Sequence, residues 1–314
     1  MKKIKATLIG VPLDLGAENL GVDIGPNAFR YEEIKEKLES ANIELFDAGN
    51  VFCNNRNKLE IGNPKAKYLQ EIVRISNDTA KLVDQTVKKG EKVIVLGGDH
   101  SVSLGSISGA SVTLKQNLGL IYFDAHGDMN TDKTTLTGNI HGMHLAALLG
   151  FGHKDLTGVY GKLKKIDKKN LLHIGGCDLD QAEIDLIEKE KLSTYQMMDV
   201  LSFGLNPLFK KIDNFKKQVK NIWVSLDLDV IDVMYAPGAG MGNQGGLNYR
   251  EIATIAGYIG KNCNVIGVDL VEYNPLQDVS GKTAELGIEL IAKFLGSNYS
   301  WYTNYLRKNK LNHH

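Results

Sequence analysis

The chain contains 314 residues, and its 37 lysines and arginines balance 37 aspartates and glutamates, so the formal net charge is zero. Apolar residues make up 43 % and charged residues 24 %, which is an ordinary globular composition. Neutrality argues against nucleic-acid-binding and membrane-surface proteins, since both need a basic excess. No apolar run reaches the roughly 18 residues of a membrane span. We therefore expect neither nucleic acid nor a membrane as a partner.

The cysteines and the N-terminal sequence favour a cytoplasmic protein. Cys53, Cys177 and Cys263 are odd in number and far apart in the chain. They are expected to be reduced thiols, not a disulfide framework or a zinc site. The short apolar run Ala6–Pro12 does not have the form of a signal peptide.

Short apolar runs alternate with helical patterns along the chain. The expected strands are Lys5–Val11, Lys92–Leu96, Leu118–Phe123, Leu171–Ile174, Asn221–Leu226 and Asn264–Leu270. The expected helices are Ala28–Ser40, residues 63–90, Gln181–Lys191, Asn206–Lys217, Asn248–Gly260 and Lys282–Leu295. Several strands are apolar on both faces, which is typical of a parallel sheet covered by helices.

This alternation predicts the α/β class, with a parallel β-sheet, right-handed crossovers and helices on both faces. No linker, repeat or low-complexity tract divides the chain, so residues 1–314 are expected to form a single domain. The glycine-rich stretch Ala236–Gly246 lies between a strand and a helix, where a long functional loop is expected.

Three of the expected strands end directly before residues that bind metals in proteins. The segments are Gly97-Gly98-Asp99-His100-Ser101, Asp124-Ala125-His126-Gly127-Asp128-Met129-Asn130 and Asp227-Leu228-Asp229. Ligands bind beyond the carboxyl ends of strands in open α/β sheets, so these segments are expected to meet at one edge. Side chains two residues apart in an extended segment point to one side. The spacing therefore brings Asp124, His126 and Asp128 to one focus, and pairs Asp227 with Asp229.

The charges of this set predict two metal ions. Four carboxylates at one point repel one another unless cations compensate them. Two divalent ions supply four positive charges, and six ligands are more than one catalytic ion needs. An oxygen-rich set with imidazoles suits Mn²⁺ better than zinc, and an ion pair lowers the pKa of a bridging water. The expected ligands of two Mn²⁺ per chain are His100, Asp124, His126, Asp128, Asp227 and Asp229.

The three segments resemble the metal-binding signatures of the ureohydrolases, and within them those of the arginases. The resemblance starts at Gly10–Gly16 and Gly21–Pro26 and ends near Leu295. It implies an arginase/deacetylase-like fold that assembles as a homotrimer or hexamer. It also implies that a hydroxide bridging two Mn²⁺ hydrolyses L-arginine to L-ornithine and urea.

The resemblance assigns a role to each residue of the metal and catalytic set. One ion would be held by His100 and Asp128, the other by His126 and Asp229, with Asp124 and Asp227 bridging both. Asp128 would also accept a hydrogen bond from the hydroxide and assist proton transfer. His141 would carry a proton to the leaving ornithine amine, which suits a histidine with a pKa near 6.5. Glu272, after the last strand, would lie near the guanidinium group.

Four further residues would recognise the amino-acid end of the substrate. The resemblance places Asn130 and Thr137 at the α-carboxylate, and Asp180 and Glu183 at the α-amino group. Asp180 and Glu183 also have the spacing of a helix capping box, and both roles can hold together.

Some residues depart from the family pattern and leave alternatives open. Thr137 replaces the usual serine, Met241 and Gly242 replace Thr-Pro, and Val233 replaces a proline. Met241 keeps open another ureohydrolase activity, that of an agmatinase, a guanidino-acid hydrolase or a formimidoylglutamase. A deacetylase-type hydrolase with one zinc ion and a non-catalytic arginine-binding protein are more distant alternatives.

Overall fold

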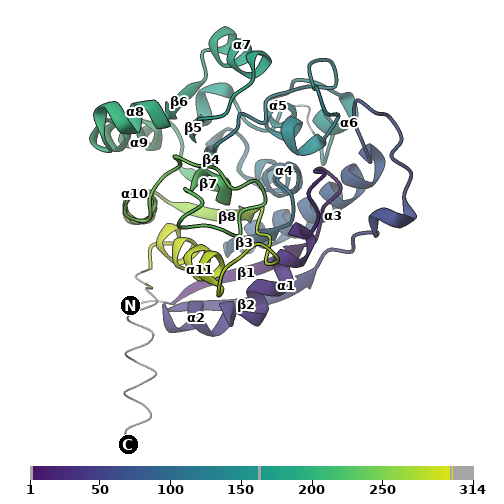
Figure 1. The fold of residues 1–314 in the computed structure, drawn as a ribbon. Coiled ribbons are helices and arrows are strands. Elements are labelled where there is room, and N and C mark those ends of the chain that lie inside the picture. The colour runs from purple at the N-terminus through teal and green to yellow at the C-terminus, as the bar shows by residue number, and fades with distance from the viewer. Residues whose placement is uncertain (1–2, 162–163, 298, 300–314) are drawn as a thin grey trace, which may run out of the picture.

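The computed structural model describes residues 3–161, 164–297 and 299. In this part of the chain, eight parallel strands form one sheet in the order β2-β1-β3-β8-β7-β4-β5-β6 (Figure 1). The strands are β1 Ile4–Val11, β2 Ile43–Asn50, β3 Lys92–Gly97, β4 Leu118–Asp124, β5 Leu171–Gly175, β6 Ser193–Gln196, β7 Asn221–Asp227 and β8 Val265–Val271. All six predicted strands are present, and the predicted fold class is confirmed.

Both edge strands, β2 and β6, were missed by the sequence analysis. In β2 only Ile43 and Leu45 are buried, and the other side chains are exposed or half-buried. β6 contains only four residues. An edge strand faces the core less than a central one and is often short or polar, so its apolar pattern is weak.

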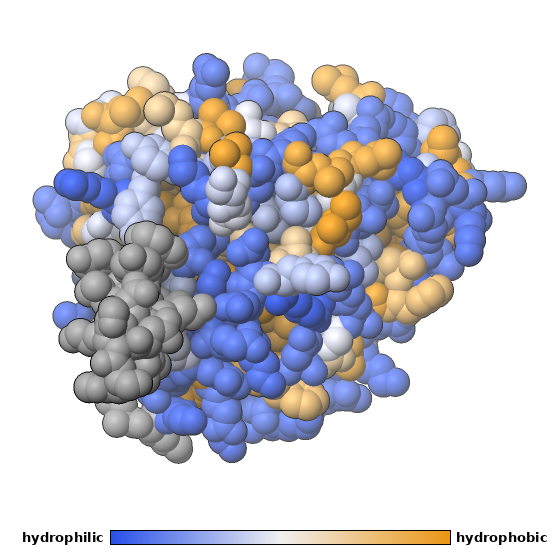
Figure 2. All heavy atoms as spheres, turned by 60° about the horizontal axis from the view of Figure 1, so that its bottom comes forward, coloured by the Kyte–Doolittle hydropathy of each residue, from blue (hydrophilic) through white to orange (hydrophobic). Residues whose placement is uncertain are grey.

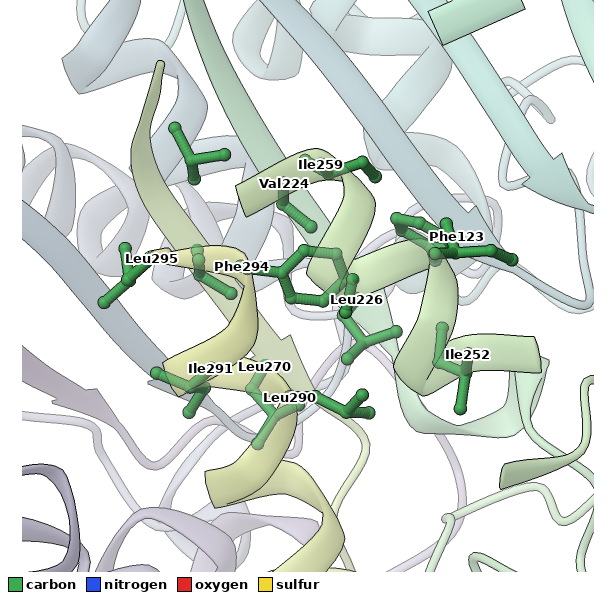
Figure 3. Close-up of a cluster of buried hydrophobic side chains, with 14 of the residues drawn as sticks. Phe123, Val224, Leu226, Ile252, Ile259, Leu270, Leu290, Ile291, Phe294 and Leu295 are labelled. Atoms are coloured by element: carbon green, nitrogen blue, oxygen red, sulfur yellow. The ribbon is translucent and has the colours of Figure 1, made fainter. Parts of the chain in front are cut away.

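Helices cover both faces of the sheet (Figure 1). They are α1 Gly25–Tyr31, α2 Ile34–Ser40, α3 Leu69–Lys88, α4 Val102–Leu114, α5 His144–Leu148, α6 Lys154–Thr157, α7 Gln181–Glu190, α8 Met197–Phe203, α9 Asn206–Gln218, α10 Tyr249–Asn262 and α11 Lys282–Phe294. α3, α4 and α5 pack on one face, and α1, α2, α9, α10 and α11 pack on the other. On the second face the Phe294 ring of α11 lies 5.5 Å from the Phe123 ring of β4, centroid to centroid (Figure 3).

The first two predicted helices differ from the observed ones. The predicted helix Ala28–Ser40 is two helices, because the chain breaks at Glu33, whose φ of 57° is left-handed. The predicted helix over 63–90 begins only at Leu69, after Tyr68 with a φ of 54°. Each break is a left-handed residue other than glycine, which local sequence does not signal.

Helix α4 was also missed, since its serine- and glycine-rich sequence lacks a helical apolar stripe. It is buried along most of its length against α3. A Cβ on Gly105 would lie 2.7 Å from the Ser76 carbonyl oxygen, and one on Gly109 would lie 2.3 Å from that of Ala80. The two glycines therefore allow a close approach of the helices that a larger side chain would prevent.

The four central strands deliver the predicted functional segments to one edge. β3, β8, β7 and β4 are neighbours in the sheet, and their carboxyl ends are Gly97, Val271, Asp227 and Asp124. The segments that follow these strands consequently lie side by side.

Figure 2 shows a mainly hydrophilic face on which apolar residues occur in small groups. In the part of the chain that the structure describes, no helix is long and apolar enough to span a membrane. The single sheet supports one domain, but the predicted bounds 1–314 include residues outside this part and stay a prediction.

Candidate metal centre and active site

The structure brings the three predicted metal-binding segments together in two groups. In the first, Nδ1 of His100 lies 2.9 Å from Oδ2 of Asp124, 3.1 Å from Oδ2 of Asp227 and 3.3 Å from Oδ2 of Asp128. In the second, Nδ1 of His126 lies 3.0 Å from Oδ2 of Asp229 and 3.4 Å from Oδ1 of Asp124. Asp124 thus presents one carboxylate oxygen to each group.

The backbone reaches this arrangement through turns and not through the extended segments that the spacing predicts. β4 ends at Asp124, and Asp128 has a left-handed φ of 51°. Asp229 lies in a 3₁₀ turn, Leu228–Val230. Its backbone N–H donates to Oδ1 of Asp227 at 2.9 Å. The prediction that these acidic side chains converge is therefore correct, but the extended backbone on which it was based explains the convergence only in part.

The electrostatics of the cluster favour cations. All four aspartates are buried, and within the described residues their ion pairs are with histidines only, never with lysine or arginine. Burial, then the neighbouring carboxylates of Asp229 and Asp124, raises the pKa of Asp227 well above its usual range. Buried carboxylates without cationic side chains are a donor set that fits divalent metal ions. Two sets of side chains each converge closely enough to hold one ion. One set is His100, Asp124 and Asp227, and the other is Asp124, His126 and Asp229.

A buried tyrosine and a buried histidine support this cluster and were missed by the sequence analysis. The hydroxyl group of Tyr122 donates to Oδ2 of Asp124 at 2.8 Å and to Oδ2 of Asp128 at 2.6 Å. His144 lies beside them, with Nδ1 2.6 Å from the carbonyl oxygen of His141. Burial, followed by the nearby His100, lowers the pKa of His144 to about 4. Tyr122 could have been found from the two-residue period of β4, which places it on the same face as Asp124.

The metal-binding cluster opens into a cavity of about 270 Å³. Its walls include every predicted catalytic and substrate-binding residue: Asp128, Asn130, Thr137, His141, Asp180, Glu183 and Glu272. Three further polar residues of the wall, Thr135, Asn139 and Asp178, were not predicted. Asn139 follows Thr137 by two residues in the same loop, and that proximity was the available signal.

Glu272 connects the last central strand to the first metal-binding segment. Its left-handed backbone, with a φ of 60°, lets Oε1 accept the backbone N–H of His100 at 2.9 Å. The same oxygen lies 3.6 Å from Nδ1 of His141. Burial lowers the pKa of His141, but the contact with Glu272 and the charges of Asp128 and Asp99 together raise it to about 9.

The acidic wall of the cavity is fixed by the capping box expected at the start of α7. The Asp180 side chain accepts the backbone N–H of Glu183 at 3.0 Å, and the Glu183 side chain accepts that of Asp180 at 3.1 Å. Asn130 donates its carboxamide hydrogen to Oδ2 of Asp180 at 2.7 Å. Burial, then the charge of Asp128, raises the pKa of Glu183 to about 7.

Three of the departures from the family pattern, Val233, Met241 and Gly242, lie close together in one loop. Met241 lines the cavity and is 42 % exposed. A Cβ on Gly242 would lie 2.9 Å from Cγ2 of Val233. The branched side chain of Val233 thus occupies the space that a side chain at 242 would enter, so these two departures are physically coupled.

Comparisons with known proteins agree with this geometry. The arginase family model matches residues 4–296. An arginase from Brevibacillus brevis is 37 % identical over 291 residues, which cover 92 % of this chain and 97 % of the relative. The native arginase structure from Bacillus caldovelox matches with a TM-score of 0.90 at 36 % identity, covering 96 % of this chain and all of the other. The Entamoeba histolytica arginase in complex with L-ornithine matches with a TM-score of 0.87 at 27 % identity, covering 94 % of this chain and 100 % of that one. The predicted resemblance is confirmed, and the chain belongs to the arginase family.

Proposed function

We propose that the protein hydrolyses the guanidino C–N bond of L-arginine to give L-ornithine and urea. The observation that carries the proposal is one cavity with a buried His/Asp cluster at one end and the Asn130, Thr137, Asp180 and Glu183 side chains in its wall. Family membership supports the same activity. A free amino acid with a guanidinium side chain has the charges that these two ends would recognise.

We propose two Mn²⁺ as the cofactors of this cluster. His100 and Asp128 would hold one ion, His126 and Asp229 the other, and Asp124 and Asp227 would bridge them. The bridging role of Asp124 is supported by its two carboxylate oxygens, since Oδ2 faces His100 and Oδ1 faces His126. When bound, such ions lower the pKa of water and make hydroxide available near neutral pH.

The side chains of the cavity would perform the remaining steps. The Glu272 carboxylate would bind the planar guanidinium group, and Asp128 would accept a hydrogen from the attacking water. Water oxygen bonds to the guanidinium carbon, and the bond from that carbon to the side-chain nitrogen breaks. His141 would deliver the proton that the leaving amine needs, and its contact with Glu272 keeps the imidazole protonated to higher pH.

The amino-acid end of the substrate would lie along the other part of the cavity. Asp180 and Glu183 would read the α-amino group, and Asn130 and Thr137 the α-carboxylate. We further propose a homotrimer or hexamer in the cytoplasm, which the family resemblance and the unpaired cysteines support.

Another ureohydrolase activity is a second candidate, because Met241 puts a flexible thioether in the cavity wall where the family commonly has threonine. A single-zinc hydrolase is less compatible with two groups of three ligands. Urea release from L-arginine by the Mn²⁺-loaded and the metal-stripped protein tests the proposal, with the metal content measured in parallel. We expect urea only from protein that carries two ions per chain. Metal-independent release, or full activity with one ion, would contradict it.

A further inference from the structure

A lysine behind the cavity wall makes a contact that the proposed function does not use. Nζ of Lys67 donates to Oδ1 of Asn139 at 3.2 Å and forms an ion pair with Oε1 of Glu18 at 2.6 Å. The backbone N–H of Lys67 donates to the carbonyl oxygen of Gly138 at 3.0 Å. Lys67 therefore holds both the backbone next to Asn139 and the Asn139 side chain itself.

The chemistry of an ammonium group decides which way the Asn139 carboxamide turns. An ammonium group has donors and no acceptor, so the carboxamide must offer its oxygen to Lys67. The other branch of the carboxamide is then the NH₂ group. Asn139 is only 8 % exposed and lines the cavity, and among the described residues no acceptor binds this NH₂ group. The NH₂ group is thereby available as a donor to a ligand in the cavity.

The neighbouring side chains of Asn130 and Thr137 also make hydrogen bonds within the protein, and each keeps a hydrogen that it can donate. Asn130 donates to Asp180 at 2.7 Å, and its oxygen accepts the hydroxyl hydrogen of Thr134 at 2.9 Å. The Thr137 hydroxyl oxygen accepts the backbone N–H of Asn139 at 3.2 Å, which leaves its hydrogen free to donate. Asn130 keeps one carboxamide hydrogen besides its bond to Asp180, so the donors open to an anionic group at this end include this hydrogen, the Thr137 hydroxyl and the Asn139 NH₂ group.

We propose that Lys67 is a positioning residue that determines specificity for substrates with an α-carboxylate. It fixes the orientation of Asn139, so that this end of the cavity presents hydrogen-bond donors to a carboxylate. Lys67 itself need not touch the substrate. The inference rests on the proposed function, and it predicts discrimination between L-arginine and agmatine, which differ only in that carboxylate.

The test is Lys67→Met, which removes the donor and keeps a long side chain. We expect KM for L-arginine to rise about tenfold, the size of one hydrogen bond to a charged group. We expect kcat to change less than twofold, and kcat/KM for agmatine to stay unchanged. Lys67→Arg keeps a donor-only cation and is expected to restore KM. Lys133→Met removes an equal charge from an exposed lysine in the same loop as Asn139 and serves as the control.

A double-mutant comparison separates orientation of Asn139 from a general effect on the loop. If Lys67 acts through Asn139, Lys67→Met has no further effect on KM in an Asn139→Ala background. Equal losses with both substrates, additive effects of the two substitutions, or a matching effect of Lys133→Met would overturn the proposal.

Binding measurements keep this test independent of turnover. Calorimetry on the metal-loaded protein compares L-ornithine with putrescine, which lacks the carboxylate. We expect Lys67→Met to weaken L-ornithine about tenfold and leave putrescine unchanged. If Lys67→Met has this effect on binding but the wild-type protein releases no urea, only the proposed function is refuted. Equal weakening of both ligands would refute the role of Lys67 alone.

Discussion

The hydroxyl oxygen of Tyr122 lies 2.6 Å from Oδ2 of Asp128, and the same hydroxyl group donates to Asp124. One phenol hydrogen is therefore shared by two carboxylates, that of Asp124 at the end of β4 and that of Asp128 in the segment that follows. Partners that orient ligand side chains in this way typically contribute about 10- to 100-fold to metal affinity. Tyr122 thus connects the buried core of β4 directly to the metal-binding cluster.

Replacing Tyr122 with phenylalanine should weaken metal binding without unfolding the protein. Phe keeps the fully buried ring and removes the hydroxyl, which donates to the two carboxylates and also lies 3.1 Å from Nδ1 of His100. We expect the affinity for Mn²⁺ to fall about 10- to 100-fold. Competition with a chelator measures it. Tyr160→Phe removes a hydroxyl that donates to the remote Asp84 at 3.1 Å, and should leave metal affinity unchanged. An unchanged affinity in Tyr122→Phe would show that the contact has no influence on the metals.

Asp124→Asn should remove metal from both groups. One oxygen of Asp124 faces His100 and the other faces His126, so a neutral amide weakens both positions. We expect elemental analysis to find at most one ion per chain. Asp178→Asn is the matched control, because this exposed carboxylate lies 3.9 Å from His126 on the cavity side. Two ions in Asp124→Asn would contradict the bridging assignment.

His141→Asn should lower kcat by about 10² to 10⁴, the usual contribution of general acid catalysis, while the metal content stays constant. Against the opposing effect of burial, Glu272 together with Asp128 and Asp99 raises the pKa of His141 to about 9, so the proton donor is present below that pH. Activity that depends on this donor declines as the pH rises through about 9. The pH dependence of kcat should therefore lose that decline in His141→Asn. An unaltered profile and an unaltered kcat would exclude the proton-transfer role.

Met241→Thr should sharpen recognition of the guanidinium group. It restores a hydroxyl group to the cavity wall and removes a flexible side chain that is 42 % exposed. We expect a several-fold gain in kcat/KM for L-arginine over shorter guanidino acids. Leu136→Thr, at another exposed apolar residue that lines the cavity, is the comparison variant. If the ranking of substrates did not change, methionine at position 241 would have no influence on substrate specificity.

The central sheet and the metal-binding edge were predictable because both depend on strong local signals. The central strands are buried on both faces, so they form apolar runs whose ends can be read to within one residue. Ligand-binding residues gather at the carboxyl ends of parallel strands, so the segments that follow these strands were expected to meet at one edge, although the order of the strands was not predicted. The sequence alone therefore predicts that His100, Asp124 and Asp227 lie together.

Other features depend on contacts between distant segments and could not be predicted. Helix α4 exists because Gly105 fits against the backbone of α3, and such close packing leaves no apolar stripe in the sequence. The contact of Lys67 with Asn139 joins residues 72 positions apart. The coupling of Gly242 to Val233 likewise appears only when the loop is folded.

The most direct test of the account is the ratio of kcat/KM values among four compounds, measured with the Mn²⁺-loaded protein. The compounds are L-arginine, agmatine, guanidinobutyrate and formiminoglutamate, with urea measured for the first three and formamide for the last. The capping-box carboxylates Asp180 and Glu183, together with Asn130, line the cavity and predict a strong preference for L-arginine. Preference for any of the other three would keep the metal centre and contradict the proposed substrate. Absence of product from all four, with two ions bound, would contradict a catalytic role.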